Sequence, residues 1–211
     1  MGTTTATRAD LTRILRDAIV SGEYAPNQRL IEADLSESYG ASRAAVRTAL
    51  LELAAEGLVD RLPNRGSRVR QIPLSEAIEI LEVRMSLEGL CAAKAAENIT
   101  DAAIAEFTQL RADILAAAES DLFEYSRLNQ VLDRRIREIA NHPTAVGILE
   151  RLRAQGVRHQ FRLAFYPGRA AVSAPEHAAI IDAIVARDPA RAEAETRAHL
   201  GSVIQALHTI G

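Results

Sequence analysis

The stretch Gly40-Ala41-Ser42-Arg43-Ala44-Ala45-Val46-Arg47-Thr48-Ala49-Leu50 decides how the first third of this 211-residue chain is expected to fold. Gly40-Ala41 predicts a tight turn. After the turn, Val46, Ala49, Leu50 and Leu53 recur at the spacing of one helix face. Gly57 is a natural residue just past a helix end, so we expect a helix over 42–56.

The flanking sequence places this helix third in a compact series of elements. Apolar residues at helical spacing predict helices over 8–20 and 31–39. After the third helix, 58–62 and 67–72 predict two short strands around the hairpin turn Pro63-Asn64-Arg65-Gly66. The order helix, helix, turn, helix, hairpin indicates a winged helix-turn-helix with a small two-stranded wing.

Two arginines on the third helix suggest what this unit binds. Arg43 and Arg47 are four residues apart, so they share one face near the start of the helix. A recognition helix places its early residues in the major groove, where arginine bonds a guanine edge or a phosphate. Arg65 at the hairpin tip could reach a phosphate or the minor groove. The alternative is that these arginines are simply solvated, but the Gly turn and the hairpin favour DNA binding.

The composition excludes several classes of protein. Apolar residues make up 48% and charged residues 25%, which is typical of a globular chain rather than a disordered one. The single cysteine, Cys91, suits a reducing compartment. No apolar run approaches the ~20 residues that span a bilayer. We therefore expect a cytoplasmic protein with no membrane contact.

The rest of the chain predicts a second, all-helical domain. Pro73 marks the boundary, because proline cannot continue a helix from within, and Ser75 is a plausible N-cap after it. We expect domains over 1–72 and 73–211, and a mainly α fold. The helices predicted for the second domain, joined by short connections that favour an antiparallel six-helix bundle, are 75–97, 101–118, 121–140, 144–165, 173–187 and 189–209.

Several polar residues of the second domain fall on apolar helix faces. Asn129 and Asp133 lie one turn apart at the edge of an apolar arc, and His177 and His199 lie on apolar stripes. Two imidazoles and a carboxylate can bind a divalent metal. The alternatives are satisfied core histidines, and an Asp133 paired with a buried arginine such as Arg84 or Arg158.

An arginine on the first bundle helix is a candidate effector contact. Arg84 could form a bidentate bond to a ligand carboxylate, or it could pair internally with Glu88 one turn away. Arg158 could line the same cavity.

The N-terminal part resembles the DNA-binding domain of the GntR family of bacterial transcription regulators. The matching residues are Ile19 to Pro26, Arg29 to Leu35, Gly40 to Leu50, Leu53, Glu56 to Val59 and Pro63 to Val69. The resemblance implies that five residues lie at the DNA surface: Ser42, Arg43, Arg47, Arg65 and Gly66.

The C-terminal part resembles the FCD ligand-binding domain of the FadR subgroup. Glu82 to Glu88 is similar to its opening, and Glu176 to Ile184 and Asp188 to Leu200 to its close. The resemblance implies a helical bundle that senses small carboxylic acids or fatty acyl groups, often around a metal. The family pattern has Asp at position 129 and His at position 133, so two of the four implied ligands, Asn129, Asp133, His177 and His199, have changed. Zinc or nickel suits the histidines, although another divalent ion or no metal remains open.

These observations predict a ligand-responsive transcription regulator rather than an enzyme. We expect a homodimer on double-stranded operator DNA, with a small organic acid as effector and repression as the outcome that the resemblance implies. One alternative is a metal-dependent hydrolase or lyase in the helical part, against which stands the lack of a nucleophile–base pair. A second is an architectural DNA-binding protein without an effector.

Overall fold

The computed structural model describes residues 8–62 and 66–210, and the side chains of 8, 9, 157, 158, 160–162, 164 and 210 lie outside its description. Contacts between residues divide the chain into two units, 1–73 and 74–211. In the described part of the chain, none of the helices is long and apolar enough to cross a membrane.

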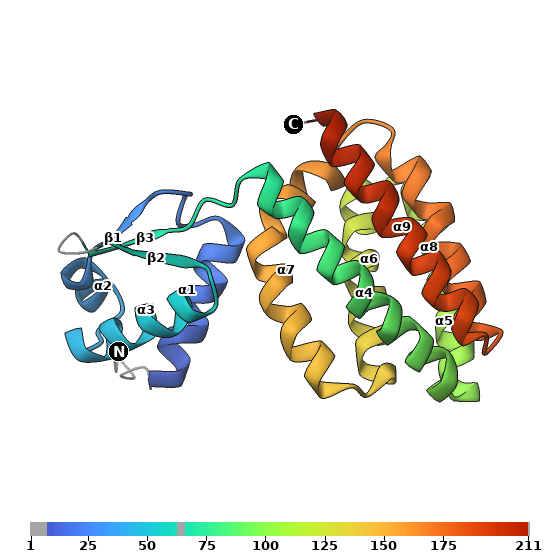
Figure 1. The fold of residues 1–211 in the computed structure, drawn as a ribbon, viewed down its shortest axis with the longest axis horizontal. Helices are drawn as coiled ribbons and strands as arrows, with labels where there is room; N and C mark the ends of the chain where they lie inside the picture. Colours follow the sequence, from blue (N-terminus) through green and yellow to red (C-terminus); the bar gives the residue numbers. More distant parts are fainter. Residues whose placement is uncertain (1–7, 63–65, 211) are drawn as a thin grey trace. The chain divides into compact units, whose positions relative to one another are not determined.

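The first unit is a winged helix-turn-helix. Its helices are α1 (Arg8–Ser21), α2 (Glu32–Ser38) and α3 (Arg43–Ala55), and its strands are β1 (Arg29–Leu30), β2 (Val59–Leu62) and β3 (Gly66–Val69). Figure 1 shows the strands gathered along one side of the helices. Leu11, Leu15, Leu50 and Leu53 are fully buried between the helices, as the apolar spacing predicts.

The sheet has three strands where the sequence predicted two. β1 pairs with β3, and β3 pairs with β2, all antiparallel, in the order β1-β3-β2. β1 covers only Arg29 and Leu30, which is too short for a period-2 pattern to reveal. Strand β1 forms because β3 has a free edge with which it can pair. Leu30 lies opposite Ser67 in this pairing, and its side chain is buried.

The second unit is the predicted helical bundle. Its helices are α4 (Leu74–Asn98), α5 (Asp101–Ser120), α6 (Leu122–Ala140), α7 (Pro143–Ala164), α8 (Arg169–Val185) and α9 (Pro189–Ile210). Helix α4 packs along α9, and α5 packs against α8 (Figure 1). The main core includes Phe107, Ile114, Leu132 and Ile181, from α5, α6 and α8. Such a bundle leaves room for a ligand between helices that face one another.

Most helix starts differ from the predicted bounds by at most one residue, and the starts of α4 and α8 change the role expected of particular residues. Helix α4 begins at Leu74, so Ser75 lies inside it rather than capping it. Helix α8 begins at Arg169, a turn before the predicted start, and contains Pro175. The extra turn is held because buried Arg169 donates hydrogen bonds to Ser202 Oγ (2.7 Å) and Glu176 Oε2 (3.1 Å).

Candidate functional site

The turn between α2 and α3 fixes where the third helix begins. Gly40 has φ +59°, a conformation that favours glycine. Ser36 Oγ donates to the Ala41 carbonyl, which holds the turn against α2. Ser42 then caps α3, since its hydroxyl accepts the Ala45 N–H at 3.1 Å. The family-implied DNA residue Ser42 is therefore also the N-cap of the helix.

Contacts with α1 fix which face of α3 is exposed. Thr12 Oγ1 donates to Glu52 at 2.7 Å, and the Arg16 guanidinium makes two hydrogen bonds of 2.7 Å to Glu56. The carboxylate of Glu56 raises the pKa of Arg16. Together with the buried Val46 and Leu50, these contacts prevent α3 from rotating about its axis.

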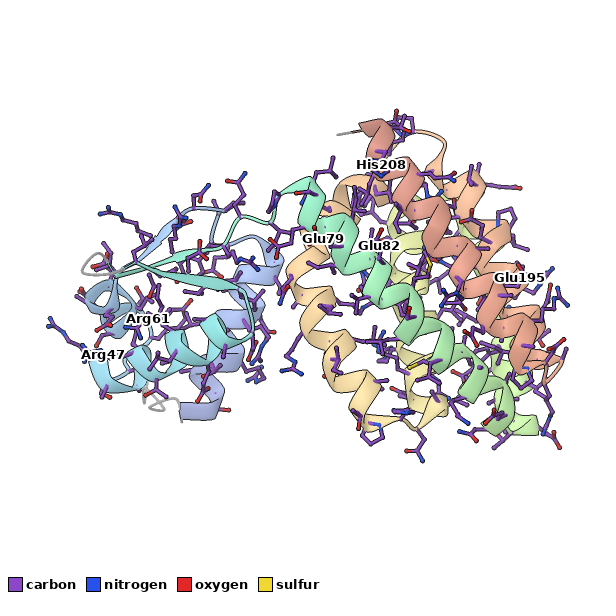
Figure 2. All side chains as sticks on the ribbon, in the orientation of Figure 1. Arg47, Arg61, Glu79, Glu82, Glu195 and His208 are labelled. Carbon is purple, nitrogen blue, oxygen red and sulfur yellow. The ribbon has the colours of Figure 1, made fainter. Side chains whose placement is uncertain are left out.

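The opposite face of α3 carries the predicted arginines. Arg43 and Arg47 are both exposed, and the side chain of Arg47 is 61% exposed. Arg47 is nevertheless not merely solvated: its Nη2 and Nε lie 2.9 Å and 3.2 Å from the carboxylate oxygens of Glu32 on α2. Figure 2 marks Arg47 on α3 and Arg61 on β2 within this unit. Glu32 could not be identified from the sequence as a partner of Arg47, because nothing in the spacing links positions 32 and 47.

The wing supplies one predicted residue within the described part of the chain. Gly66 begins β3 opposite Leu62 with φ +82°, as the close of a tight hairpin requires. Arg65 lies outside the described residues. Arg61, exposed on β2, adds a positive charge that helps to lower the pKa of Glu32.

In the bundle, the predicted residue Asp133 is paired with an arginine. Its Oδ2 lies 2.6 Å from Nη2 of Arg153 on α7, so Asp133 pairs with an arginine, as the alternative predicted, but this arginine is half-buried and is neither Arg84 nor Arg158. Burial raises the pKa of Asp133, but the positive charge of Arg153 and other groups outweighs it and lowers the pKa to about 2. The buried Leu149, one turn before Arg153, indicates that this arginine faces the core, but the spacing within α7 does not reveal that its partner is Asp133 on α6.

The two predicted histidines lie together but face other partners. The rings of His177 and His199 are 4.4 Å apart. His177 Nδ1 lies 3.2 Å from the Tyr125 hydroxyl, and His199 Nδ1 lies 2.8 Å from Glu176. Burial, followed by the nearby His199, lowers the pKa of His177 to about 3, so its ring is neutral at physiological pH.

The predicted effector arginine Arg84 pairs internally with Glu88, which was the alternative to a contact with a ligand. It is buried on α4, where its Nε donates to Glu88 Oε1 at 2.8 Å. Arg153 Nη1 lies 3.6 Å from the same oxygen, so Glu88 joins the two arginines. The backbone of Arg158 is helical in α7, but its side chain lies outside the described part.

A pocket brings several of these groups together. Its volume is about 420 Å³, counting the space at its open mouth. Asp133, His177 and His199 line it together with Arg137 and Glu88; Asn129 is not among the lining residues. The Asn129 amide oxygen is buried and has no hydrogen-bond partner among the described residues.

The predicted metal set does not fit a divalent ion in this arrangement. Three protein ligands are the usual minimum for such a site, yet Asp133 is held by Arg153 and His199 faces Glu176. Among the residues that the structure describes, no three His, Cys, Asp or Glu side chains form a group that could hold a metal. Zinc or nickel thus stays a prediction from the resemblance, without support from this geometry.

Comparison with known proteins identifies a domain family for each of the two units. Residues 7–69 match the family described as "Bacterial regulatory proteins, gntR family", and residues 79–202 match the FCD domain. A winged helix-turn-helix followed by such a bundle defines a bacterial transcription regulator. The chain belongs to the GntR family and carries an FCD domain.

Full-length relatives support the assignment. The chain is 27% identical to the HTH-type transcriptional repressor RspR of Escherichia coli K12, over 94% of this chain and 87% of the relative. It is 29% identical to the HTH-type transcriptional regulator LutR of Bacillus subtilis 168, over 88% and 94%. The structure of E. coli McbR/YncC has the same fold, with a TM-score of 0.77, 23% identity and 96% and 97% coverage. These proteins are transcription regulators, so the hydrolase or lyase alternative is not supported.

Proposed function

We propose that this regulator is a cytoplasmic repressor whose binding to operator DNA is controlled by a small organic acid. One observation carries the DNA part: the exposed face of α3 presents Arg43 and Arg47, while its other face is buried and its start is capped. Repression is supported by the repressor RspR among the relatives.

A homodimer follows from the size of the reading unit. One winged helix-turn-helix contacts too few base pairs to select a single site in a genome. Two copies on a two-fold operator double the number of contacts. We therefore propose a dimer with one α3 in each of two half-sites.

The pocket in the bundle favours an anion as effector. Arg137 is the arginine among the residues that line the pocket, and two of the lining carboxylates, Asp133 and Glu88, already face Arg153, which is not itself a lining residue. Burial, followed by the charge of Arg153, lowers the pKa of Arg137 at the pocket wall. A ligand carboxylate in the pocket would pair with the guanidinium of Arg137 and offset the repulsion between Arg137 and Arg153.

The effector regulates only if it binds one arrangement of the dimer more tightly than another. We propose that the acid favours an arrangement in which the two α3 helices no longer match the half-sites, so that DNA is released. We propose that the guanidinium of Arg137 holds the acid and that no metal is required.

The DNA part is tested with duplexes enriched by the wild-type protein from a random pool. Arg43→Ala should weaken binding to an enriched duplex by about 1–3 kcal/mol if the arginine contacts a base. Arg134→Ala, at an exposed position of α6 in the bundle, is the control and should bind as the wild type does. Unchanged binding by Arg43→Ala would remove this residue from the interface.

The effector part is tested by titrating a panel of short mono-, di- and hydroxycarboxylic acids against the protein–duplex complex. At least one acid should lower DNA affinity without being turned over, and the effect should persist after dialysis against EDTA. An effect that EDTA abolishes would mean that a metal, rather than arginine alone, holds the acid.

A further inference from the structure

The contact between Glu32 and Arg47 joins the two helices of the helix-turn-helix at its exposed side. Glu32 is the first residue of α2, and Arg47 lies on α3. The pairing is side-on: Nε donates to Oε1 at 3.2 Å, and Nη2 donates to Oε2 at 2.9 Å. We propose that Glu32 is a positioning residue, which holds Arg47 so that the other edge of its guanidinium reads a guanine.

The donor geometry of arginine supports this role. A guanidinium carries its N–H groups on two edges, one formed by Nε and Nη2 and the other by Nη1 and Nη2. Glu32 occupies the first edge. The second edge is left to pair with O6 and N7 of a guanine, and the Arg47 side chain is 61% exposed.

The charges around Glu32 keep its carboxylate ionised, as pairing with Arg47 requires. The hydrogen bond from Arg47 lowers the pKa of Glu32, and the charges of Arg61 and Arg43 lower it further. Glu32 therefore remains ionised at neutral pH. An exposed ion pair contributes little to folding stability, so holding the arginine still is the larger effect of this pair.

A carboxylate at this place also repels phosphates. It therefore opposes binding to DNA of arbitrary sequence, while the fixed arginine favours a guanine in one position. Both effects act in the same direction, toward discrimination between sequences. The inference rests on the proposed DNA-binding function and adds a specificity residue to it.

The experiment compares wild type, Glu32→Gln, Arg47→Ala and the double variant on an enriched duplex and on a scrambled duplex of equal composition. Glu32→Gln should reduce the ratio of the two affinities about tenfold, within the range that a bidentate arginine–guanine pair supplies. The double variant should lose no more than Arg47→Ala alone, because Glu32 acts through Arg47. On the scrambled duplex, Glu32→Gln should bind more tightly, with a steeper salt dependence.

Asp34→Asn is the matched control, because it removes the same charge from an exposed position of α2. It should leave the ratio unchanged, and circular dichroism should show equal helix content in all variants. Discrimination retained by Glu32→Gln, or losses that add in the double variant, would overturn the role of Glu32. If the wild type enriches no duplex, the DNA-binding function itself fails, which is a distinct result.

Discussion

At the scale of single residues, the paired carboxylate of Asp133 is the most informative side chain of the bundle. Asp133→Asn would leave Arg153 without its 2.6 Å partner in a half-buried place. We expect a loss of about 1–3 kcal/mol in the free energy of unfolding, between the values for exposed and fully buried pairs. Urea unfolding measures this loss.

A double variant shows whether Asp133→Asn lowers the free energy of unfolding by leaving Arg153 unpaired or by disturbing the helix in general. Asp133→Asn with Arg153→Met removes both charges, so it should recover much of the stability that the single change loses. Arg127→Ala breaks an exposed pair with Glu124 on the same helix and should leave the free energy of unfolding almost unchanged. A double variant less stable than the sum of the single changes would contradict the pairing.

Side-chain partners were the part of the site that sequence could predict least. The apolar faces showed that Asp133 and Arg84 need partners, but a partner on another helix depends on how helices cross, which no spacing within one helix reveals. Glu88 lies on the same helix as Arg84 and could be named, whereas Arg153 lies on α7 and could not.

At the scale of elements, α3 depends on its cap. Ser42→Ala removes the acceptor of the Ala45 N–H and should lower the free energy of unfolding by about 1 kcal/mol. Ser38→Ala, at the exposed end of α2, is the control and should change it little. Thermal unfolding of both variants tests the cap, and equal melting temperatures would show that the hydroxyl is dispensable.

Helices and strands in which apolar residues recur at a regular spacing could be predicted from the sequence, and those without such a spacing could not. Helices such as α3 and α6 follow from recurring apolar residues, because burial of one face requires that spacing. Strand β1 has two residues and exists only by pairing with β3 across the unit. The early start of α8 depends on Arg169 meeting Ser202 from α9, a contact distant in sequence.

At the scale of the whole molecule, the bundle has a core of its own. The clusters around Phe107 and around Leu81 are built entirely from residues after Pro73. A protein comprising 74–211 should therefore fold alone, with high helix content and one cooperative urea transition. A broad, non-cooperative transition would show that the bundle needs the N-terminal unit.

The hydrogen bonds from Thr12 and Arg16 to the far side of α3 set a lower limit on how small the DNA-reading part can be made. A synthetic peptide covering residues 29–70 would contain each of the five family-implied DNA residues and still lack the helix against which α3 is braced. Transplanting DNA recognition into another scaffold therefore means carrying α1 along, although it contributes none of those five residues.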